Sequence, residues 1–185
     1  MFMRRAFSAL LVSCSVFALS ATTAPAATAA PVSVPSAESA VALSISPGSG
    51  VIQIRNRSGK CLEVENSSTA NGAQAQQWDC NGQAGSYWYL EYAFGNNFEV
   101  RIVNSRSGKC LDVSNSSTAD GARVQQWSCA NVGGQRWHVM NTSGATHVIR
   151  NVSSDKYLEI ENSSTANGAN AQIWRQLYQS GMYWH

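Results

Sequence analysis

Three carboxylates stand at equivalent places in this chain, each followed by a glutamine and then a tryptophan at fixed spacing. The residues are Glu63, Gln76 and Trp78, then Asp112, Gln125 and Trp127, then Glu159, Gln172 and Trp174. A carboxylate accepts strong hydrogen bonds from hydroxyl groups, and an aromatic ring covers the apolar C–H face of a pyranose. An amide donates and accepts at once. These are the residue types that recognition of a sugar requires.

Catalysis needs arrangements that this pattern does not offer. Glycosidases use two carboxylates roughly 5–10 Å apart, whereas the candidate carboxylates occur once per repeat, so a threefold fold would hold them far apart. His138, His147 and His185 have no serine or cysteine partner pattern beside them for nucleophilic catalysis. We therefore expect no enzymatic activity and no cofactor.

Each candidate triplet belongs to a longer pattern written three times. Residues 58–80, 107–129 and 154–176 align at offsets of 49 and 47 residues, and all contain the phrase NSSTANGA or NSSTADGA. Each copy has an upstream strand-like run, at residues 51–56, 98–104 and 147–151, and a second tryptophan, at Trp88, Trp137 and Trp184. A period of this length indicates a repeat architecture. The predicted repeats cover about residues 51–96, 97–145 and 146–185.

Within each copy the pattern is that of β-strands. Leu62 and Val64 alternate with Glu63, which places the apolar and acidic side chains on opposite faces. Four strands per copy, separated by turn residues, give about twelve short strands. Propellers typically need four to eight blades, and open solenoids need capping repeats. Three copies therefore favour an all-β fold, a closed β-trefoil of three pseudo-symmetric repeats, with the second tryptophans in its core.

The repeated phrase itself is interpreted as the connecting turn of a hairpin. Its Asn-Gly or Asp-Gly end is suited to reversing the chain. Its backbone could also border a pocket.

The N-terminal segment has the pattern of a secretory signal peptide. Arg4 and Arg5 precede an apolar run at residues 6–19, and the small residues at 27–29 fit a cleavage site. The predicted organisation is a signal peptide at 1–29, a flexible Ser/Ala/Pro-rich leader at 30–50 and one domain at 51–185. We expect a secreted, extracellular protein. The alternative is a lipid anchor, because the residues before Cys14 also resemble a lipoprotein box.

The charge balance excludes several partners. The chain has 13 Lys and Arg residues against 11 Asp and Glu residues, and removal of Arg4 and Arg5 with the signal peptide makes the two counts equal. Without a basic run, nucleic acid and anionic membranes are not expected partners. No segment after the signal peptide is apolar enough to span a membrane. We expect a monomer.

Four cysteines fall outside the signal peptide in two pairs of equal spacing. Cys61 and Cys80 lie in the first copy, and Cys110 and Cys129 lie in the second. Four cysteines allow three pairings, and the equal spacing favours the pairing within each copy. A zinc site is the alternative, but the CxxC or histidine partners that it needs are missing. Disulfides agree with export.

The copies resemble the ricin B-type lectin repeat, which carbohydrate-binding modules of family 13 in secreted bacterial proteins share. The likeness rests on SGKCL[DE]V, on QxWxC and on a further tryptophan, and it extends over residues 51–185, although the third copy lacks the cysteines. The resemblance implies a non-catalytic β-trefoil with up to three sugar pockets. It also implies galactose- or xylose-type ligands, bound weakly at each pocket and more strongly by several pockets together.

The resemblance also implies which residues form the pockets. The family's usual asparagine, three residues before the second tryptophan, is Gly85, Gly134 or Gly181 here, and the glutamine that follows survives only as Gln135. The second pocket is therefore the best candidate, with Asp112, Gln125, Trp127 and Gln135. The first and third pockets are weaker candidates, with Glu63, Gln76, Trp78, Glu159, Gln172 and Trp174.

Other interpretations stay open at the level of sequence. The first tryptophan of each copy could pack beneath its hairpin, and the glutamines could serve only to brace the backbone. Glu63 and Glu159 could pair with Lys60 and Lys156 at the surface, which would contribute little. A trefoil whose sugar sites have decayed could act as an inhibitor or protein-interaction module, and the three glycines favour that function.

Overall fold

The computed structural model of the chain describes residues 45–93 and 95–185. The predicted signal peptide, the alternative lipid site at Cys14 and most of the predicted leader lie outside the described residues. Ile45 is buried in the hydrophobic core, so the packed part of the chain includes residues before Val51. Among the described residues, no helix has the length and apolarity needed to cross a membrane.

Short strands and single helical turns alternate along the described chain. The strands are β1 (Cys61–Val64), β2 (Ala75–Trp78), β3 (Trp88–Ala93), β4 (Asn96–Asn104), β5 (Cys110–Val113), β6 (Ala122–Trp127), β7 (Trp137–Ser143), β8 (Thr146–Asn151), β9 (Tyr157–Ile160) and β10 (Ala171–Trp174). The 3₁₀ turns are η1 (Glu65–Ser67), η2 (Ala84–Ser86), η3 (Ser114–Ser116), η4 (Gly133–Gln135), η5 (Glu161–Ser163) and η6 (Ser180–Met182). In each repeat one of these turns lies between the two strands of the central hairpin, and the other follows the second strand.

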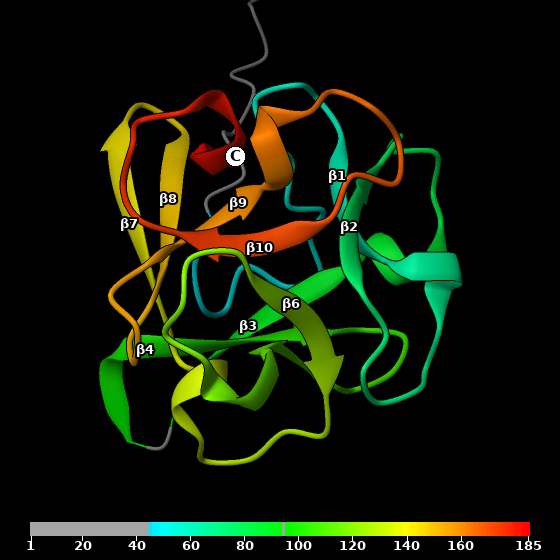
Figure 1. The fold of residues 1–185 in the computed structure, drawn as a ribbon. Coiled ribbons are helices and arrows are strands. Elements are labelled where there is room, and N and C mark those ends of the chain that lie inside the picture. The colour runs from blue at the N-terminus through cyan, green and yellow to red at the C-terminus, as the bar shows by residue number, and fades with distance from the viewer. Residues whose placement is uncertain (1–44, 94) are drawn as a thin grey trace, which may run out of the picture. The chain divides into compact units, whose positions relative to one another are not determined.

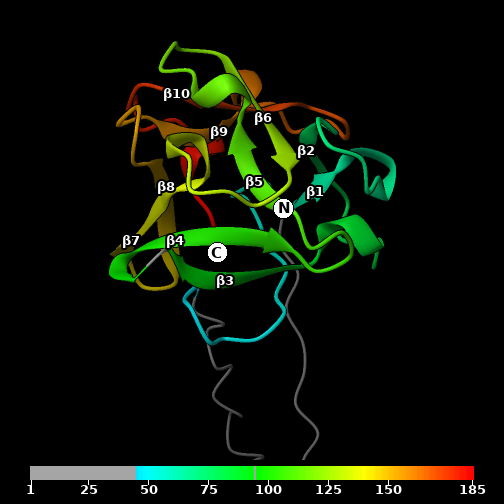
Figure 2. The ribbon, with the colours of Figure 1, turned by 90° about the horizontal axis from the view of Figure 1, so that it is seen from below.

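The first and fourth strands or strand-like segments of each repeat form a closed barrel. Strands β3 and β4 pair, as do β7 and β8, and Val100 of β4 joins Trp137 of β7. Single bridges complete the ring, between Ile52 and Trp88 and between Trp184 and both Asn56 and His147. The described residues thus form ten strands where the sequence predicts about twelve, because the segments around Ile52 and Trp184 pair only at isolated positions. Figure 2 shows β3 and β4 as a paired ribbon.

The second and third strands of each repeat form a hairpin, which gives the three hairpins β1–β2, β5–β6 and β9–β10. The second strands of these hairpins meet one another, and β2, β6 and β10 lie side by side in Figure 1. The contacts follow a cycle, with Gln74 opposite Gln125, Arg123 opposite Gln172, and Asn170 opposite Gln76. The three repeats therefore close on each other with threefold pseudo-symmetry, as the sequence predicts for a β-trefoil.

The second tryptophans lie in the core, as predicted. Trp88, Trp137 and Trp184 are fully buried, and their indole N–H groups donate to the carbonyls of Leu62, Leu111 and Leu158 at 2.9, 3.1 and 3.2 Å. Each bond ties the last strand of a repeat to the first strand of its own hairpin. A buried indole that lacks such a partner would be costly.

The predicted disulfides are confirmed. Cys61 bonds Cys80, and Cys110 bonds Cys129. Each bridge closes a loop of about twenty residues, which contributes about 3 kcal/mol in the chain-entropy account. The third repeat has Tyr157 and Gln176 at the two cysteine positions instead.

Candidate functional site

The predicted carboxylates and glutamines face each other across the three hairpins. Strand register pairs Glu63 with Gln76, Asp112 with Gln125, and Glu159 with Gln172. The Gln76 amide donates to Glu63 at 3.2 Å, and the Gln125 amide donates to Asp112 at 2.9 Å. All three carboxylates are at least nine-tenths buried. They form the floor of a pocket rather than an exposed face.

The lysines do not neutralise these carboxylates. Lys60 bonds Asp79, and Lys156 bonds Asp120, each at 2.6 Å. The surface ion pairs considered from the sequence are therefore wrong. Alternation in each strand still holds, because Leu62 and Val64 enter the core while Glu63 points to the opposite side, where the 3₁₀ turns cover it.

The first tryptophan of each repeat stands at the side of its pocket. Trp127 is 44% exposed, and Trp78 and Trp174 are partly exposed. Each ring also contacts the repeated phrase of the preceding repeat. A β-carbon added to Gly72 would lie 3.6 Å from the Trp127 ring, and one added to Gly121 would lie 3.4 Å from the Trp174 ring.

The same contact closes the cycle. A β-carbon added to Gly168 of the third repeat would lie 3.6 Å from the ring of Trp78 in the first repeat. The N–H groups of Gly72, Gly121 and Gly168 donate to backbone carbonyls of the next hairpin, each at 2.9 Å. The repeated phrase therefore borders two pockets, because its first half lies in its own repeat and its glycine packs on the tryptophan of the next repeat.

The first half of the phrase has an unusual backbone. Asn66, Asn115 and Asn162 have φ values of 55, 56 and 55°, and the serine after each also has positive φ. The hydroxyls of Ser67, Ser116 and Ser163 accept from the N–H groups of Gly85, Gly134 and Gly181 at 2.9, 3.0 and 3.1 Å. This tight turn covers one side of the carboxylate.

The three glycines before the second tryptophans have a steric reason. A β-carbon on Gly85 would lie 2.8 Å from the backbone of Ser67, and those on Gly134 and Gly181 would lie 2.7 and 2.8 Å from carbonyl oxygens. No side chain fits at these positions. The interpretation of these glycines as a sign of decayed sites is therefore unnecessary, since the backbone itself requires them.

Amide side chains reach the pockets from two different loop positions. In the second repeat Gln135 is buried, bonds the carboxylate of Asp112 and holds the backbone of Ser128 and Ala130. In the first repeat Gln83 fills this role when its amide is assigned the orientation that satisfies both neighbours, in which its nitrogen donates to Glu63 and its oxygen accepts from the indole N–H of Trp78 at 3.3 Å.

The equivalent of Gln83 in the third repeat is Gln179, which also lines its pocket. Neither residue is among the predicted site residues, because that prediction concerned only the position of Gln135. Alignment of the repeats places Gln83 and Gln179 at the same position in two copies, but this signal does not by itself place them beside a carboxylate.

The three pockets differ in size. The first, of about 290 Å³, is lined by Glu63, Asn66, Ser67, Gln76, Trp78 and Gln83. The second, of about 400 Å³, is lined by Asp112, Asn115, Ser116, Gln125, Trp127, Ser128, Cys129, Ala130, Val132 and Gln135. The third, of about 550 Å³, is lined by Glu159, Glu161, Asn162, Ser163, Gln172, Trp174, Leu177 and Gln179. Every site residue that the sequence predicts lies in one of these pockets.

Burial changes the acidity of the pocket floors. It raises the pKa of Glu63 and of Asp112, while hydrogen bonds from Gln76 in the first pocket, and from Gln125 and Gln135 in the second, lower it. Burial, followed by the charge of Asp120, raises the pKa of Glu159 to about 7.

A family comparison agrees with this geometry. Residues 42–127 and 88–174 match the model of the ricin-type β-trefoil lectin domain-like family. The chain belongs to this family. No curated protein matches the chain in sequence.

Several solved structures share this fold. ThreeFoil, a designed threefold-symmetric protein, is 34% identical with a TM-score of 0.70, over 74% of this chain and 96% of its own. The exo-β-1,3-galactanase 1,3Gal43A from Clostridium thermocellum is 30% identical with a TM-score of 0.68, over 71% of this chain but only 28% of its own. The Rhizoctonia solani agglutinin is 17% identical with a TM-score of 0.64, over 84% of this chain and 96% of its own, and this likeness concerns the fold alone.

Proposed function

We propose that this protein binds carbohydrate through three pockets, one per repeat, without catalysing a reaction. One observation carries the proposal. Each pocket joins a buried carboxylate, a glutamine opposite it, a partly exposed tryptophan and a loop amide. The binding residues are Asp112, Gln125, Trp127 and Gln135 in the second pocket, Glu63, Gln76, Trp78 and Gln83 in the first, and Glu159, Gln172, Trp174 and Gln179 in the third.

The chemistry of each pocket suits a sugar. The carboxylate accepts bonds from neighbouring hydroxyls, which charge assistance strengthens. The tryptophan covers the apolar face of the ring. Because each pocket is shallow and partly open to water, we expect millimolar to high micromolar affinity for a single sugar, raised by avidity on a polymer.

Galactose- and xylose-type sugars are the first candidates. The family supports this class, and the galactanase that shares the fold at 30% identity acts on a galactan, as its name states. The two disulfides support secretion to an oxidising compartment, where polysaccharides would be met.

Substitutions in the second pocket test the proposal. Asp112→Ala and Trp127→Ala should each weaken retention on the matching polysaccharide by roughly tenfold, because each removes one of the two main contacts. Affinity electrophoresis in gels that contain galactan, xylan or another polysaccharide would measure retention, with circular dichroism as the control for folding. Unchanged retention of both folded variants would contradict this assignment of residues.

A protein-interaction module remains the alternative function. The sequence supported this alternative because the family's asparagine is replaced by glycine. In the structure, however, the backbone leaves no space for a side chain at Gly85, Gly134 and Gly181. The amides of Gln83 and Gln135 lie beside the carboxylates in its place. The observed geometry therefore favours sugar binding over this alternative.

A further inference from the structure

The third pocket differs from the other two in the state of its carboxylate. Glu159 is only 2% exposed, and its Oε2 atom has no hydrogen-bond partner among the described residues. In the first pocket, Gln76 and Gln83 donate to the two oxygens of Glu63. A buried carboxylate oxygen without a donor is costly. A ligand that donates a hydrogen bond to this oxygen would therefore gain binding energy that the other pockets do not offer.

The surroundings of Glu159 are acidic. Glu161 lines the same pocket, and no lysine, arginine or histidine lies among the described residues that line it. Asp120 adds a second negative group, since its charge raises the pKa of Glu159. Lys156 and Arg175 both bond Asp120, at 2.6 and 2.5 Å, and neither forms an ion pair with Glu159.

Asp120 is the single residue that differs among the three copies of the repeated phrase. The equivalent residues are Asn71 and Asn167. The turn that carries Asp120 packs on the third pocket, because the neighbouring Gly121 lies against the Trp174 ring. Glu161 also has no equivalent in a pocket, since Glu65 and Ser114 do not line theirs. Both departures from threefold symmetry lie at the third pocket, where Lys156 and Arg175 pair with Asp120.

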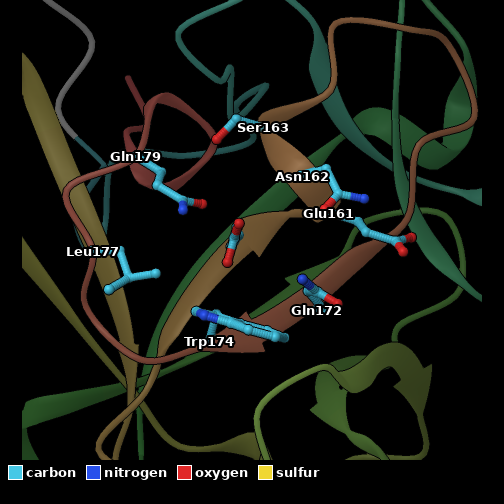
Figure 3. A pocket seen from close by; sticks show the side chains of 8 residues that line it. Glu161, Asn162, Ser163, Gln172, Trp174, Leu177 and Gln179 are labelled. Carbon is cyan, nitrogen blue, oxygen red and sulfur yellow. The ribbon is translucent and has the colours of Figure 1, made fainter.

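The remaining walls suit a sugar ring. Figure 3 shows Trp174 and Gln179 on two sides of the pocket, with the amide of Gln179 directed into it. The indole offers an apolar face, and Gln172 hydrogen-bonds the carboxylate from the opposite strand. The pocket thus combines a surface for a pyranose with an unpaired acidic group.

We propose that the third pocket selects a sugar that carries a free amino group, a hexosamine or an oligomer of one. This inference rests on the proposed carbohydrate function and names the ligand class of one of its sites. The ammonium group donates to Oε2 of Glu159, in a pocket whose described lining residues include no cation that would compete with it. An N-acetylated amine carries no charge, and a hydroxyl forms a weaker bond than an ammonium group, so both bind this pocket less tightly.

A titration followed by NMR at the tryptophan indole N–H signals tests the inference. The probes are a tetramer of glucosamine, its fully N-acetylated counterpart and a neutral galactose oligomer, at about pH 7, where Glu159, with a pKa of about 7, is partly ionised and an amine with a pKa of about 8 is largely protonated. We expect the glucosamine tetramer to shift the Trp174 signal and to bind there at least about tenfold more tightly than the N-acetylated form, the range of a charge-assisted bond. Glu159→Gln should remove that preference.

The matched control is Glu65→Gln, which removes one negative charge of the first repeat outside its pocket and should keep the preference. Equal affinity for the two tetramers, or a preference that survives Glu159→Gln, would overturn the inference. A spermidine titration that competes as strongly as the glucosamine tetramer would also overturn it, because the site would then recognise amines rather than amino sugars. If the inference fails but the galactose oligomer still shifts the signals of Trp78 or Trp127, the proposed carbohydrate function stands. If no sugar shifts any indole signal, both proposals fail.

Discussion

At the scale of single residues, the equivalent carboxylates of the three pockets have different electrostatic surroundings. Burial acts on all three pocket carboxylates, but Glu63 and Asp112 each have amide donors that lower the pKa again. Burial, followed by the charge of Asp120, raises the pKa of Glu159 to about 7, although a hydrogen bond from Gln172 lowers it. The groups around each buried carboxylate therefore differ between the pockets.

The pKa of Glu159 predicts a pH dependence of stability. Its ordinary value is 4.5, and the folded protein raises it to about 7, so the folded state holds the proton more tightly than the unfolded chain does. Glu159 therefore favours the unfolded state increasingly as the pH rises through this window. In Glu159→Gln this loss is absent.

Chemical denaturation of both proteins between pH 4 and pH 8 measures the effect. The free energy of unfolding of Glu159→Gln should rise relative to that of the wild type, by on the order of 2–3 kcal/mol across this range. Comparison of each protein with itself at two pH values cancels any constant effect of the amide. Parallel pH profiles would show that burial does not hold the proton on Glu159.

The sequence allowed most of the pocket residues to be predicted, but not all of them. The spacing of carboxylate, glutamine and tryptophan repeats in register, so Trp127 and Asp112 could be found from periodicity and resemblance. Gln83 could not, because the amide enters the first pocket from a loop position three residues before the equivalent of Gln135. Only the path of the loop shows that both amides reach a carboxylate.

At the scale of elements, the repeated phrase joins neighbouring repeats as well as reversing the chain. Gly72 has a φ of +81°, and its closest side-chain neighbours belong to Trp127 and Gln125 of the next repeat. The predicted turn is confirmed by this backbone. Its contact with the next pocket could not be predicted from the sequence, because that contact depends on how the three hairpins meet.

Gly72→Ala tests this role, with Gly59→Ala as a matched control. Both glycines have a φ of +81°, but an added β-carbon meets nothing within 4 Å at Gly59. Each substitution should lower the free energy of unfolding by roughly 1–2 kcal/mol, the cost of an L-residue in this conformation. Only Gly72→Ala should also shift the indole signal of Trp127 and weaken binding at the second pocket. An equal effect of both variants on Trp127 would contradict the proposed contact.

The barrel strands show a second limit of sequence patterns. The run at residues 51–56 resembles its equivalents, and Trp184 occupies the place of Trp88 and Trp137, yet both segments pair only at single bridges. They are the first and last segments of the trefoil, so each lacks the covalent hairpin partner that β4 gives β3 and β8 gives β7. Position in the ring, rather than local pattern, accounts for the difference.

At the scale of the whole molecule, threefold closure displays three similar pockets that are not identical. Two acidic residues, Asp120 and Glu161, lie at the third pocket, whereas the disulfides lie in the first two repeats. A polymer that reaches several pockets gains affinity even when each pocket is weak. We propose that small differences among the repeats alter which sugar each pocket prefers, while the fold stays the same.

The central claim is that three separate pockets bind sugar through their tryptophans. The chain has six tryptophans, and the indole N–H groups of Trp88, Trp137 and Trp184 are buried and bonded to backbone carbonyls. A titration of the folded domain with galactose, xylose and glucosamine oligomers, followed at the six indole signals, therefore distinguishes sugar binding in the pockets from changes in the core. Sugars should shift the signals of Trp78, Trp127 and Trp174 and leave the other three unchanged. If no sugar shifts these three signals in the folded protein, the proposal of three sugar-binding pockets is wrong.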